Sequence, residues 1–496
     1  MDFESSYDIE RTAEFIQIGG FTRVALQFPD ELLKDSVRIV SALRDKLRRE
    51  RESDAERNGD VKEVSLFVMA DTAYGSCCVD EVGGSHVGAD CVVHYGHTCL
   101  SPTTKLPAFF VFGKAPVSVS DCVKNLRDHA VSSSKPVLVL FGLEYAHAIQ
   151  SIKDKVVEVC ESSKLEIQFA ELLCSTMNPL ENQNNFNQGM VPPGVLSDDK
   201  SLVVSNRYSI GGLVWKLHEG RKVEDYLLFW IGSDNSAFAN VVLTFNGCEI
   251  VRYDATANCM VTDLSQQKRI LKRRYYLVEK AKDANIVGIL VGTLGVAGYL
   301  HMINQMKELI STAGKKAYTL VMGKPNPAKL ANFPECDVFI YVSCAQTALL
   351  DSKEYLAPVI TPFEAMLAFN RGSQWTGAYV MEFRDLINSS HIDSRSQSKE
   401  ARFSFLQGGY VEDFDAQENS EEEMEGPLAL ANATEKALQL RDNVNSLAKR
   451  TPKSGAEFLA ARSYQGLDIH NENTLPEPYL IGRSGRAAGY KDENSE

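Results

Sequence analysis

Short runs of apolar residues alternate along this chain with longer stretches whose apolar residues recur at helical spacing. Residues 23–28 are typical of a buried strand, and residues 29–43 follow as a predicted amphipathic helix. The apolar positions of this helix are Leu32, Val37, Ile39, Val40 and Leu43. Further apolar runs, each predicted to form a strand, occur at residues 64–70, 91–95, 136–142 and 284–292. Apolar strands separated by helices predict parallel α/β sheets.

The strand–helix rhythm begins anew at residues 136 and 284, which predicts three similar units. A single core rarely grows beyond about 250–300 residues, and this chain has 496. The predicted fold class is α/β, with three similar domains that each contain a short parallel sheet, plus a C-terminal tail. The predicted boundaries are 1–130, 131–275 and 276–385 for the domains and 386–496 for a C-terminal extension with an acidic linker.

Charge and composition narrow the possible partners and the compartment. Acidic residues outnumber basic ones by 66 to 52, giving a net charge of -14, which argues against direct binding of nucleic acid. The acidic start of the chain lacks an apolar segment, and the apolar runs are too short to cross a bilayer, so no membrane association is predicted. Eleven cysteines in such a chain predict reduced thiols and a cytoplasmic location.

Several cysteines lie directly after predicted strands. Cys77 and Cys78 follow the strand at 64–70, Cys99 follows the strand at 91–95, and Cys344 follows an apolar run at 337–343. Cys174 stands in a similar place in the second domain. Because the carboxyl ends of parallel strands meet at one edge of a sheet, thiols distant in sequence can gather there.

Spacing alone leaves two interpretations of these cysteines open. No Cys-x-x-Cys pair occurs, which argues against a zinc ribbon, a thioredoxin site and a ferredoxin-type cluster. The thiols could be ordinary buried residues, or they could bind a metal. A structural zinc site could combine Cys77, Cys78 and Cys99 with one of three nearby histidines. These are His86, His94 and His97.

One motif resembles a known signature. Asp71-Thr-Ala-Tyr-Gly-Ser-Cys-Cys-Val-Asp80 is similar to the Asp-x-x-Tyr-Gly-Ala-Cys-Cys-x-Asp motif of the diphthamide-biosynthesis radical enzymes. Arg252-Tyr-Asp254, Arg273-Arg-Tyr-Tyr276, Gly292-Thr-Leu-Gly295 and Pro362-Phe-Glu364 also resemble segments of that family. Gln465-Gly-Leu467 and Gly482-Arg-Ser-Gly485 in the tail look like its eukaryotic second-subunit branch.

The resemblance implies three α/β domains around a central 4Fe–4S cluster. In the catalytic members, one cysteine from each domain binds the cluster and leaves one iron open for S-adenosylmethionine. Cleavage of that molecule yields a 3-amino-3-carboxypropyl radical, which adds to a histidine of translation elongation factor 2. A fourth thiolate would block access to the open iron.

This chain departs from the catalytic pattern at three places. Ala255 replaces a proline, Val296-Ala297 replaces an Arg-Gln pair, and residues 345–350 lack the expected proline. The expected function is therefore an accessory iron–sulfur subunit that supports reduction of the cluster of a paralogous catalytic subunit, to which S-adenosylmethionine binds. Enzymatic activity of the isolated chain stays open, whereas the complex would be a radical aminocarboxypropyl transferase. The alternative is a metal-free or zinc-binding scaffold for the catalytic subunit.

The expected partners are that catalytic subunit, in a heterodimer, a small electron-donor protein, and elongation factor 2 as substrate. For the cluster ligands we expect Cys78, Cys99 and Cys344. Cys77 is the alternate for Cys78, since adjacent residues in an extended backbone point in different directions. Cys174 is the alternate for Cys99, because it would restore one cysteine per domain. No catalytic residue of this chain is predicted.

Overall fold

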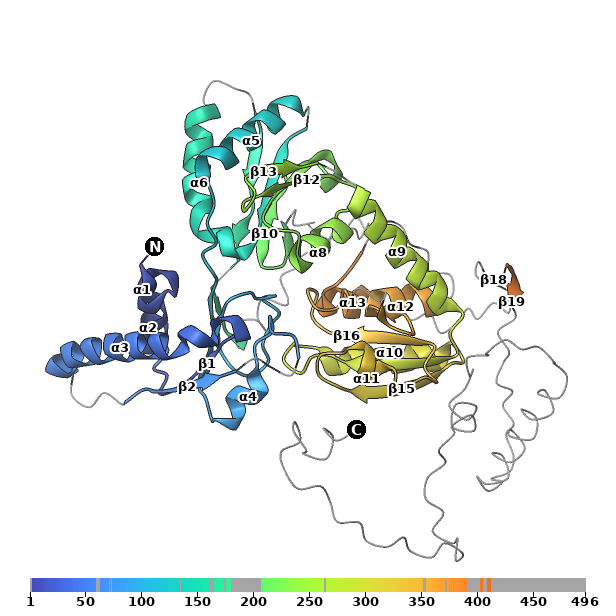
Figure 1. The fold of residues 1–496 in the computed structure, drawn as a ribbon, viewed down its shortest axis with the longest axis horizontal. Helices are drawn as coiled ribbons and strands as arrows, with labels where there is room; N and C mark the ends of the chain where they lie inside the picture. Colours follow the sequence, from blue (N-terminus) through green and yellow to red (C-terminus); the bar gives the residue numbers. More distant parts are fainter. Residues whose placement is uncertain are drawn as a thin grey trace, which may run out of the picture. The chain divides into compact units, whose positions relative to one another are not determined.

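Three separate, mainly parallel sheets organise the part of the chain that the structure describes (Figure 1). The computed structural model describes residues 2–58, 63–70, 72, 74–133, 135–160, 165–173, 175–179, 207–262, 265–350, 354–370, 373, 375, 377, 379–389, 402–404 and 408–411. The predicted ligand alternate Cys174 and most of the predicted extension 386–496 lie outside these residues.

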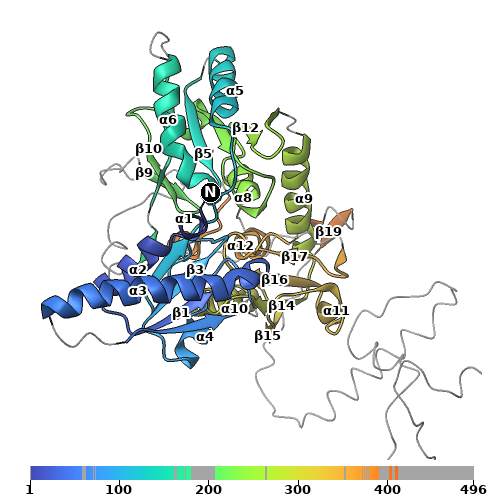
Figure 2. The same ribbon diagram turned by 60° about the vertical axis from the view of Figure 1, so that its left-hand side comes forward.

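The first sheet has the strand order β2-β1-β3-β4-β8. Its strands are β1 (Arg23–Gln27), β2 (Ser65–Met69), β3 (Cys91–Tyr95), β4 (Ala108–Val111) and the antiparallel β8 (Thr176–Met177). Its helices are α1 (Phe3–Ser6), α2 (Ile9–Ile18), α3 (Ser36–Asn58) and α4 (Glu81–His86), with the 3-10 turn η1 (Asp30–Asp35) before α3. Helices α2 and α3 lie side by side on this sheet (Figure 2). Ile16 of α2 and Ile39 and Leu43 of α3 are fully buried in one apolar cluster with residues of β1 and β3.

The second sheet has the strand order β13-β12-β11-β5-β6. Its strands are β5 (Val137–Phe141), β6 (Ile167–Phe169), β11 (Leu227–Ile231), β12 (Glu249–Asp254) and the antiparallel β13 (Cys259–Val261). The helices are α5 (Val119–Ser132), α6 (Ala146–Cys160) and α8 (Ser236–Thr244), with the 3-10 turns η2 (Leu143–Tyr145) and η3 (Val223–Asp225). A small antiparallel sheet of β7 (Glu171–Leu172), β9 (Arg207–Ile210) and β10 (Leu213–Lys216) accompanies it. Every residue of β5 and β11 is buried, as expected for central strands covered on both faces.

The third sheet is parallel throughout, with the strand order β15-β14-β16-β17. Its strands are β14 (Ile286–Val291), β15 (Lys316–Val321), β16 (Val338–Val342) and β17 (Val359–Ile360). The helices are α9 (Ser265–Lys282), α10 (Tyr299–Thr312), α11 (Pro327–Leu330), α12 (Pro362–Phe369) and α13 (Phe383–Ser389). Helices α9, α10, α12 and α13 contribute to one apolar cluster with β14 and β16, and α11 packs against the other face. A hairpin of β18 (Arg402–Ser404) and β19 (Gly409–Val411) follows.

The α/β fold class with short parallel sheets is confirmed, whereas the domain boundaries stay a prediction. Strand β8, from the range predicted as the second domain, pairs with β4 of the first sheet. The helix predicted at 29–43 was wrong in its start, because residues 30–35 form the tighter 3-10 turn. Val37 is 78% exposed instead of buried, because it lies about 200° around the axis of α3 from the buried Ile39. Within the described residues, none of the helices is both long and apolar enough to span a membrane.

Candidate metal centre

The loop after β2 carries the first two cysteines. A turn in which the Cys78 N–H donates to the Gly75 carbonyl (3.1 Å) places Cys77 and Cys78 at its end. Gln27, the last residue of β1, holds the loop on both sides: its Nε2 donates to the Cys78 carbonyl and its Oε1 accepts from the Asp80 N–H, each at 2.9 Å. Asp80 then caps the N-terminus of α4. The buried amide of Gln27 therefore fixes the backbone around both cysteines.

The loop after β3 brings Cys99 to the same place. The Cys99 N–H donates to the Cys77 carbonyl at 3.1 Å, and the Thr98 hydroxyl donates to the same oxygen at 3.2 Å. Cys99 thus lies against the Cys77 backbone although 22 residues separate the two cysteines. Strands β2 and β3 flank β1 in the sheet, so the loops that follow them meet at the carboxyl end of β1.

Cys344 comes from the third sheet, two residues after the end of β16. Its carbonyl accepts from the N–H groups of Thr347 (3.1 Å) and Ala348 (3.0 Å), so the chain turns tightly around it. Gln346 reaches back to the first sheet, where its Nε2 donates to the Thr98 carbonyl at 3.3 Å. A backbone bond from Ala297 N–H to the Pro102 carbonyl (3.0 Å) joins the same two regions.

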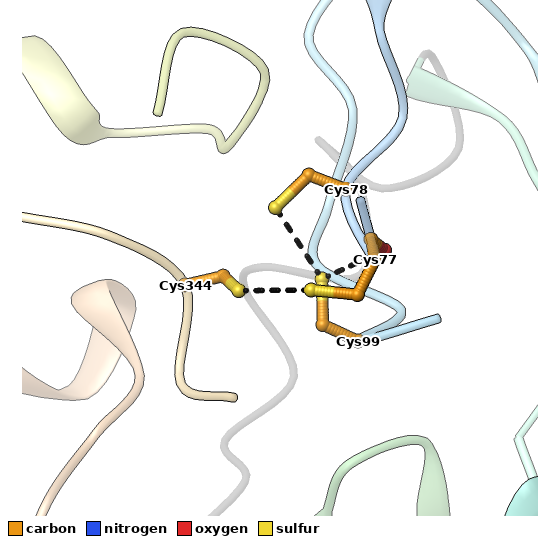
Figure 3. A group of neighbouring side chains, drawn as sticks. All are labelled: Cys77, Cys78, Cys99 and Cys344. Atoms are coloured by element: carbon orange, nitrogen blue, oxygen red, sulfur yellow. Dashed lines mark hydrogen bonds between the residues drawn. The ribbon is translucent and has the colours of Figure 1, made fainter. Parts of the chain in front are cut away.

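The four thiols of Cys77, Cys78, Cys99 and Cys344 form one buried group (Figure 3). All four Sγ atoms lie within 4.8 Å of one another. The Cys77 and Cys344 sulfurs are 3.4 Å apart, and the Cys99 and Cys78 sulfurs are 3.7 Å apart. Each side chain is at most 5% exposed, and all four cysteines are free thiols.

Hydrogen bonds among these thiols shift their acidity in opposite directions. The hydrogen bond from Cys77 is the main reason why the pKa of Cys344 lies well below its usual range, and hydrogen bonds from Cys78 and Cys99 lower it further. The pKa values of Cys77 and Cys78 are raised well above theirs, chiefly because each donates to Cys344. Three thiols therefore stabilise a negative charge on the fourth.

Two glycines allow the loops to approach closely. A Cβ at Gly295 would lie 2.4 Å from the Val79 carbonyl oxygen, next to Cys78, so only glycine fits there without backbone movement. A Cβ at Gly75 would lie 2.8 Å from the methyl group of Thr347. Both glycines belong to motifs that the sequence carries, and both stand where the first and third sheets meet around the thiols.

The structure brings together the predicted Cys78, Cys99 and Cys344, and it adds the alternate Cys77. Which of these thiols bind a metal stays a prediction, and Cys174 is not among the described residues. Cys91, Cys122 and Cys336 are also buried, but they do not belong to the group. His94, considered above for zinc, contacts the Ser76 carbonyl through Nε2 at 3.1 Å. Within the described residues, the group contains cysteines alone.

Sequence reasoning missed the residues that hold the loops. The available signal was a polar residue, Gln27, within an apolar run, and in the structure it is only 2% exposed. A polar side chain at the carboxyl end of a central strand needs partners, and the cysteine loop supplies them. Gln346 and Thr347 had no signal beyond their proximity to Cys344 in the sequence.

Four buried thiols suit a thiophilic metal by their chemistry. A tetrahedral set of four sulfurs is typical of zinc or of an iron–sulfur cluster. Fold and site together therefore define an α/β protein with a buried thiol centre able to hold such a group.

Comparisons with known proteins agree with this description. Residues 28–380 match the diphthamide synthesis protein family. The 2-(3-amino-3-carboxypropyl)histidine synthase subunit 2 of Danio rerio is 36% identical, covering 99% of this chain and 92% of that protein, and the subunit 2 of Gallus gallus is 36% identical over 100% and 94%. The fold is similar to the crystal structure of Dph2 from Pyrococcus horikoshii with a 4Fe-4S cluster, with a TM-score of 0.51 and 18% identity over 75% of this chain and 93% of that one. This chain belongs to the diphthamide synthesis protein family.

Proposed function

We propose that this chain is an accessory iron–sulfur subunit in the first step of diphthamide synthesis. In that step a 3-amino-3-carboxypropyl group passes from S-adenosylmethionine to a histidine of translation elongation factor 2. The observation that carries the proposal is the buried group of four thiols contributed by the first and third sheets. The relatives named as subunit 2 support a role within a complex, and the cluster named for the Pyrococcus horikoshii protein supports the cofactor.

The proposed ligands are Cys78, Cys99 and Cys344, with Cys77 as a fourth thiolate. A 4Fe–4S cluster held there would supply one-electron transfer. The four thiolates would hold it, and their burial keeps water away from it. Because a fourth thiolate occupies the position that a substrate would need, this ligand set favours transfer of electrons over binding of S-adenosylmethionine.

One feature beside the thiols supports the accessory role. Val296, which stands where the catalytic pattern has arginine, is 5% exposed and packs in the same apolar cluster as the four cysteines. The lining of a small cavity includes His97, Thr98 and Gln346, so the polar residues that hold the loops around the thiols line it as well.

The proposed partners follow from this role. A paralogous catalytic subunit would bind S-adenosylmethionine and form a heterodimer with this chain. A small electron-donor protein would reduce the cluster, elongation factor 2 would be the substrate, and the complex would work in the cytoplasm as a radical aminocarboxypropyl transferase.

Metal analysis of the anaerobically purified chain tests the cofactor. We expect iron and acid-labile sulfide in equal amounts and a brown colour, with no stoichiometric zinc. Serine replacements at the four cysteines should each lower the iron content. Cys122→Ser and Cys336→Ser are matched controls, since both residues are buried outside the group. Full iron in Cys99→Ser together with loss in Cys174→Ser would overturn the ligand assignment in favour of one cysteine per domain.

A transfer assay tests the accessory role. The isolated chain, supplied with reductant, S-adenosylmethionine and elongation factor 2, should modify nothing, and addition of the catalytic subunit should restore transfer. Robust transfer by the isolated chain would contradict the proposal.

A structural zinc site is the second candidate, and one observation favours it. Zinc–sulfur bonds of about 2.3 Å in a tetrahedron place the sulfurs about 3.8 Å apart. The separation of 3.7 Å between the Cys99 and Cys78 sulfurs is close to that value. A colourless protein that contains one zinc and no sulfide would establish this alternative.

A further inference from the structure

A hydroxyl group contacts one sulfur of the thiol centre directly. Thr347 Oγ1 lies 3.1 Å from Cys344 Sγ, and it also forms a hydrogen bond with Ser343 Oγ. The Ser343 hydroxyl can also donate to the Gly292 carbonyl at 3.4 Å. The hydroxyl groups of Ser343 and Thr347 thus form a short chain that ends on Cys344.

The available protons determine the direction of these bonds once Cys344 is a thiolate ligand. A thiolate has no proton, so the bond between Cys344 and Thr347 requires the Thr347 hydroxyl to donate. Thr347 has a single hydroxyl proton, so its oxygen accepts the proton of Ser343, which then no longer points to the more distant Gly292 carbonyl. The chain of bonds then runs from Ser343 through Thr347 to the Cys344 sulfur, and each donor polarises the next.

Packing fixes the rotamer that makes this contact. The methyl group of Thr347 lies against Gly75, where an added Cβ would be only 2.8 Å away. Gly75 belongs to the loop that carries Cys77 and Cys78, so the first sheet holds the Thr347 side chain with its hydroxyl towards Cys344. The backbone N–H of Thr347, which donates to the Cys344 carbonyl at 3.1 Å, restrains the residue from the other side.

We propose that Thr347 is a positioning residue that raises the reduction potential of the cluster through its hydrogen bond to Cys344 Sγ. The inference rests on the proposed function, because it requires a cluster bound by Cys344. One-electron reduction adds a negative charge that is shared by the ligand sulfurs, and no proton is transferred. A donor hydrogen bond stabilises the more negative, reduced state more than the oxidised state. Reduction of the cluster by the small electron-donor protein becomes easier as a result.

A redox titration of the anaerobic full-length chain, with dithionite as reductant and electron paramagnetic resonance as readout, tests the proposal. Thr347→Val keeps the shape and the methyl contact with Gly75 but removes the hydroxyl. We expect unchanged iron content and a reduced-to-oxidised ratio about tenfold lower at a fixed potential, which equals about 59 mV for a one-electron couple. Thr347→Ser keeps the hydroxyl and should keep the wild-type potential. Thr103→Val is the matched control, since the buried Thr103 hydroxyl has no hydrogen-bond partner among the described residues.

The outcomes separate this inference from the proposed function. A wild-type chain without iron and sulfide would refute the proposed function and the inference with it. A loaded Thr347→Val variant with the wild-type potential would refute the inference alone. If Thr347→Val does not load, Thr347→Ala and Thr347→Ser provide the same comparison without crowding Gly75. Failure of Thr347→Ala to load as well would make Thr347 an assembly residue and would overturn its role in setting the potential.

Discussion

The buried ion pair between α9 and α12 offers a sharp test of how the third sheet is held together. Arg274 Nε donates to Glu364 Oε1 at 2.6 Å, and a second guanidinium nitrogen donates to Oε2. The two side chains are 6% and 1% exposed. The carboxylate also accepts from the Tyr379 hydroxyl (2.9 Å) and the Thr361 N–H (2.8 Å). Burial by itself lowers the pKa of Arg274, but the carboxylate outweighs burial and raises it, so the guanidinium stays charged.

Glu364→Gln removes the negative charge while it keeps the shape of the side chain. The amide can accept at only one of its two terminal atoms, and the other faces hydrogen-bond donors. Loss of one partner of a buried pair costs about 3–5 kcal/mol, because the remaining charge has no counterion in the core. Since every 1.4 kcal/mol is a factor of ten, protection of the α9 and α12 amides should fall by a factor of about 100 to several thousand.

Hydrogen exchange followed by mass spectrometry measures this loss locally, without assuming that the whole chain unfolds in one step. Glu10→Gln is the matched control. Its partner is Lys46, at 3.1 Å, and Glu10 is 84% exposed, so the change should cost at most about 1 kcal/mol. The double variant Arg274→Met with Glu364→Gln should lose less amide protection, expressed as free energy, than the sum of the losses in the two single variants. A loss in Glu364→Gln no larger than in Glu10→Gln would refute the reasoning.

Three further perturbations follow from the structure. Gly295→Ala should lower iron content and thermal stability, because its Cβ would lie 2.4 Å from the Val79 carbonyl oxygen. Gly113→Ala is the control and should change neither, because the space at that position is open. Burial raises the pKa of Glu382 to about 7 from 4.5, so the native state binds the proton more tightly than the unfolded state, and stability falls as pH rises from about 4.5 to 7. In urea titrations, the difference in the free energy of unfolding between pH 5 and pH 8 should be smaller for Glu382→Gln than for the wild type. An unchanged difference would contradict this assignment. Iodoacetamide at pH 8 should modify the exposed Cys259 and spare Cys122, whose buried thiol has its pKa raised to about 12, as peptide mapping would reveal.

The apolar pattern located several central strands, because burial on both faces leaves a strong local signal, but β11 (Leu227–Ile231), which is just as buried, was not predicted. The predicted strands at 91–95 and 136–142 correspond to β3 (Cys91–Tyr95) and β5 (Val137–Phe141). The edge strand β15 was not predicted, since all of its residues are exposed or half-buried and none belongs to a buried apolar run. Local pattern also failed at residues 30–35, where a 3-10 turn took the place of the first helical turns.

The centre itself was only partly predictable from the sequence. Placement after strand ends indicated Cys99 and Cys344, because parallel strands bring their carboxyl ends to one edge. The presence of both Cys77 and Cys78 in the group depends on a turn at Gly75 and on the Gln27 amide, which lies 51 residues away from Cys78. Such contacts between distant segments leave no periodic pattern in the sequence. The only local basis for choosing between Cys77 and Cys78 was therefore the rule that adjacent side chains in an extended backbone point in different directions.

The positions where this chain departs from the catalytic pattern now have structural roles of their own. Val296 adds apolar packing beside the four cysteines, and the Ala297 N–H joins the third sheet to the Pro102 carbonyl of the first. Thr347 lies in the segment that lacks the expected proline, and it contacts Cys344. Two of the three departures therefore lie beside the thiol centre, whereas Ala255 belongs to the apolar core of the second sheet. A centre enclosed in this way would suit exchange of electrons better than access of a reacting molecule, which agrees with the accessory role proposed above.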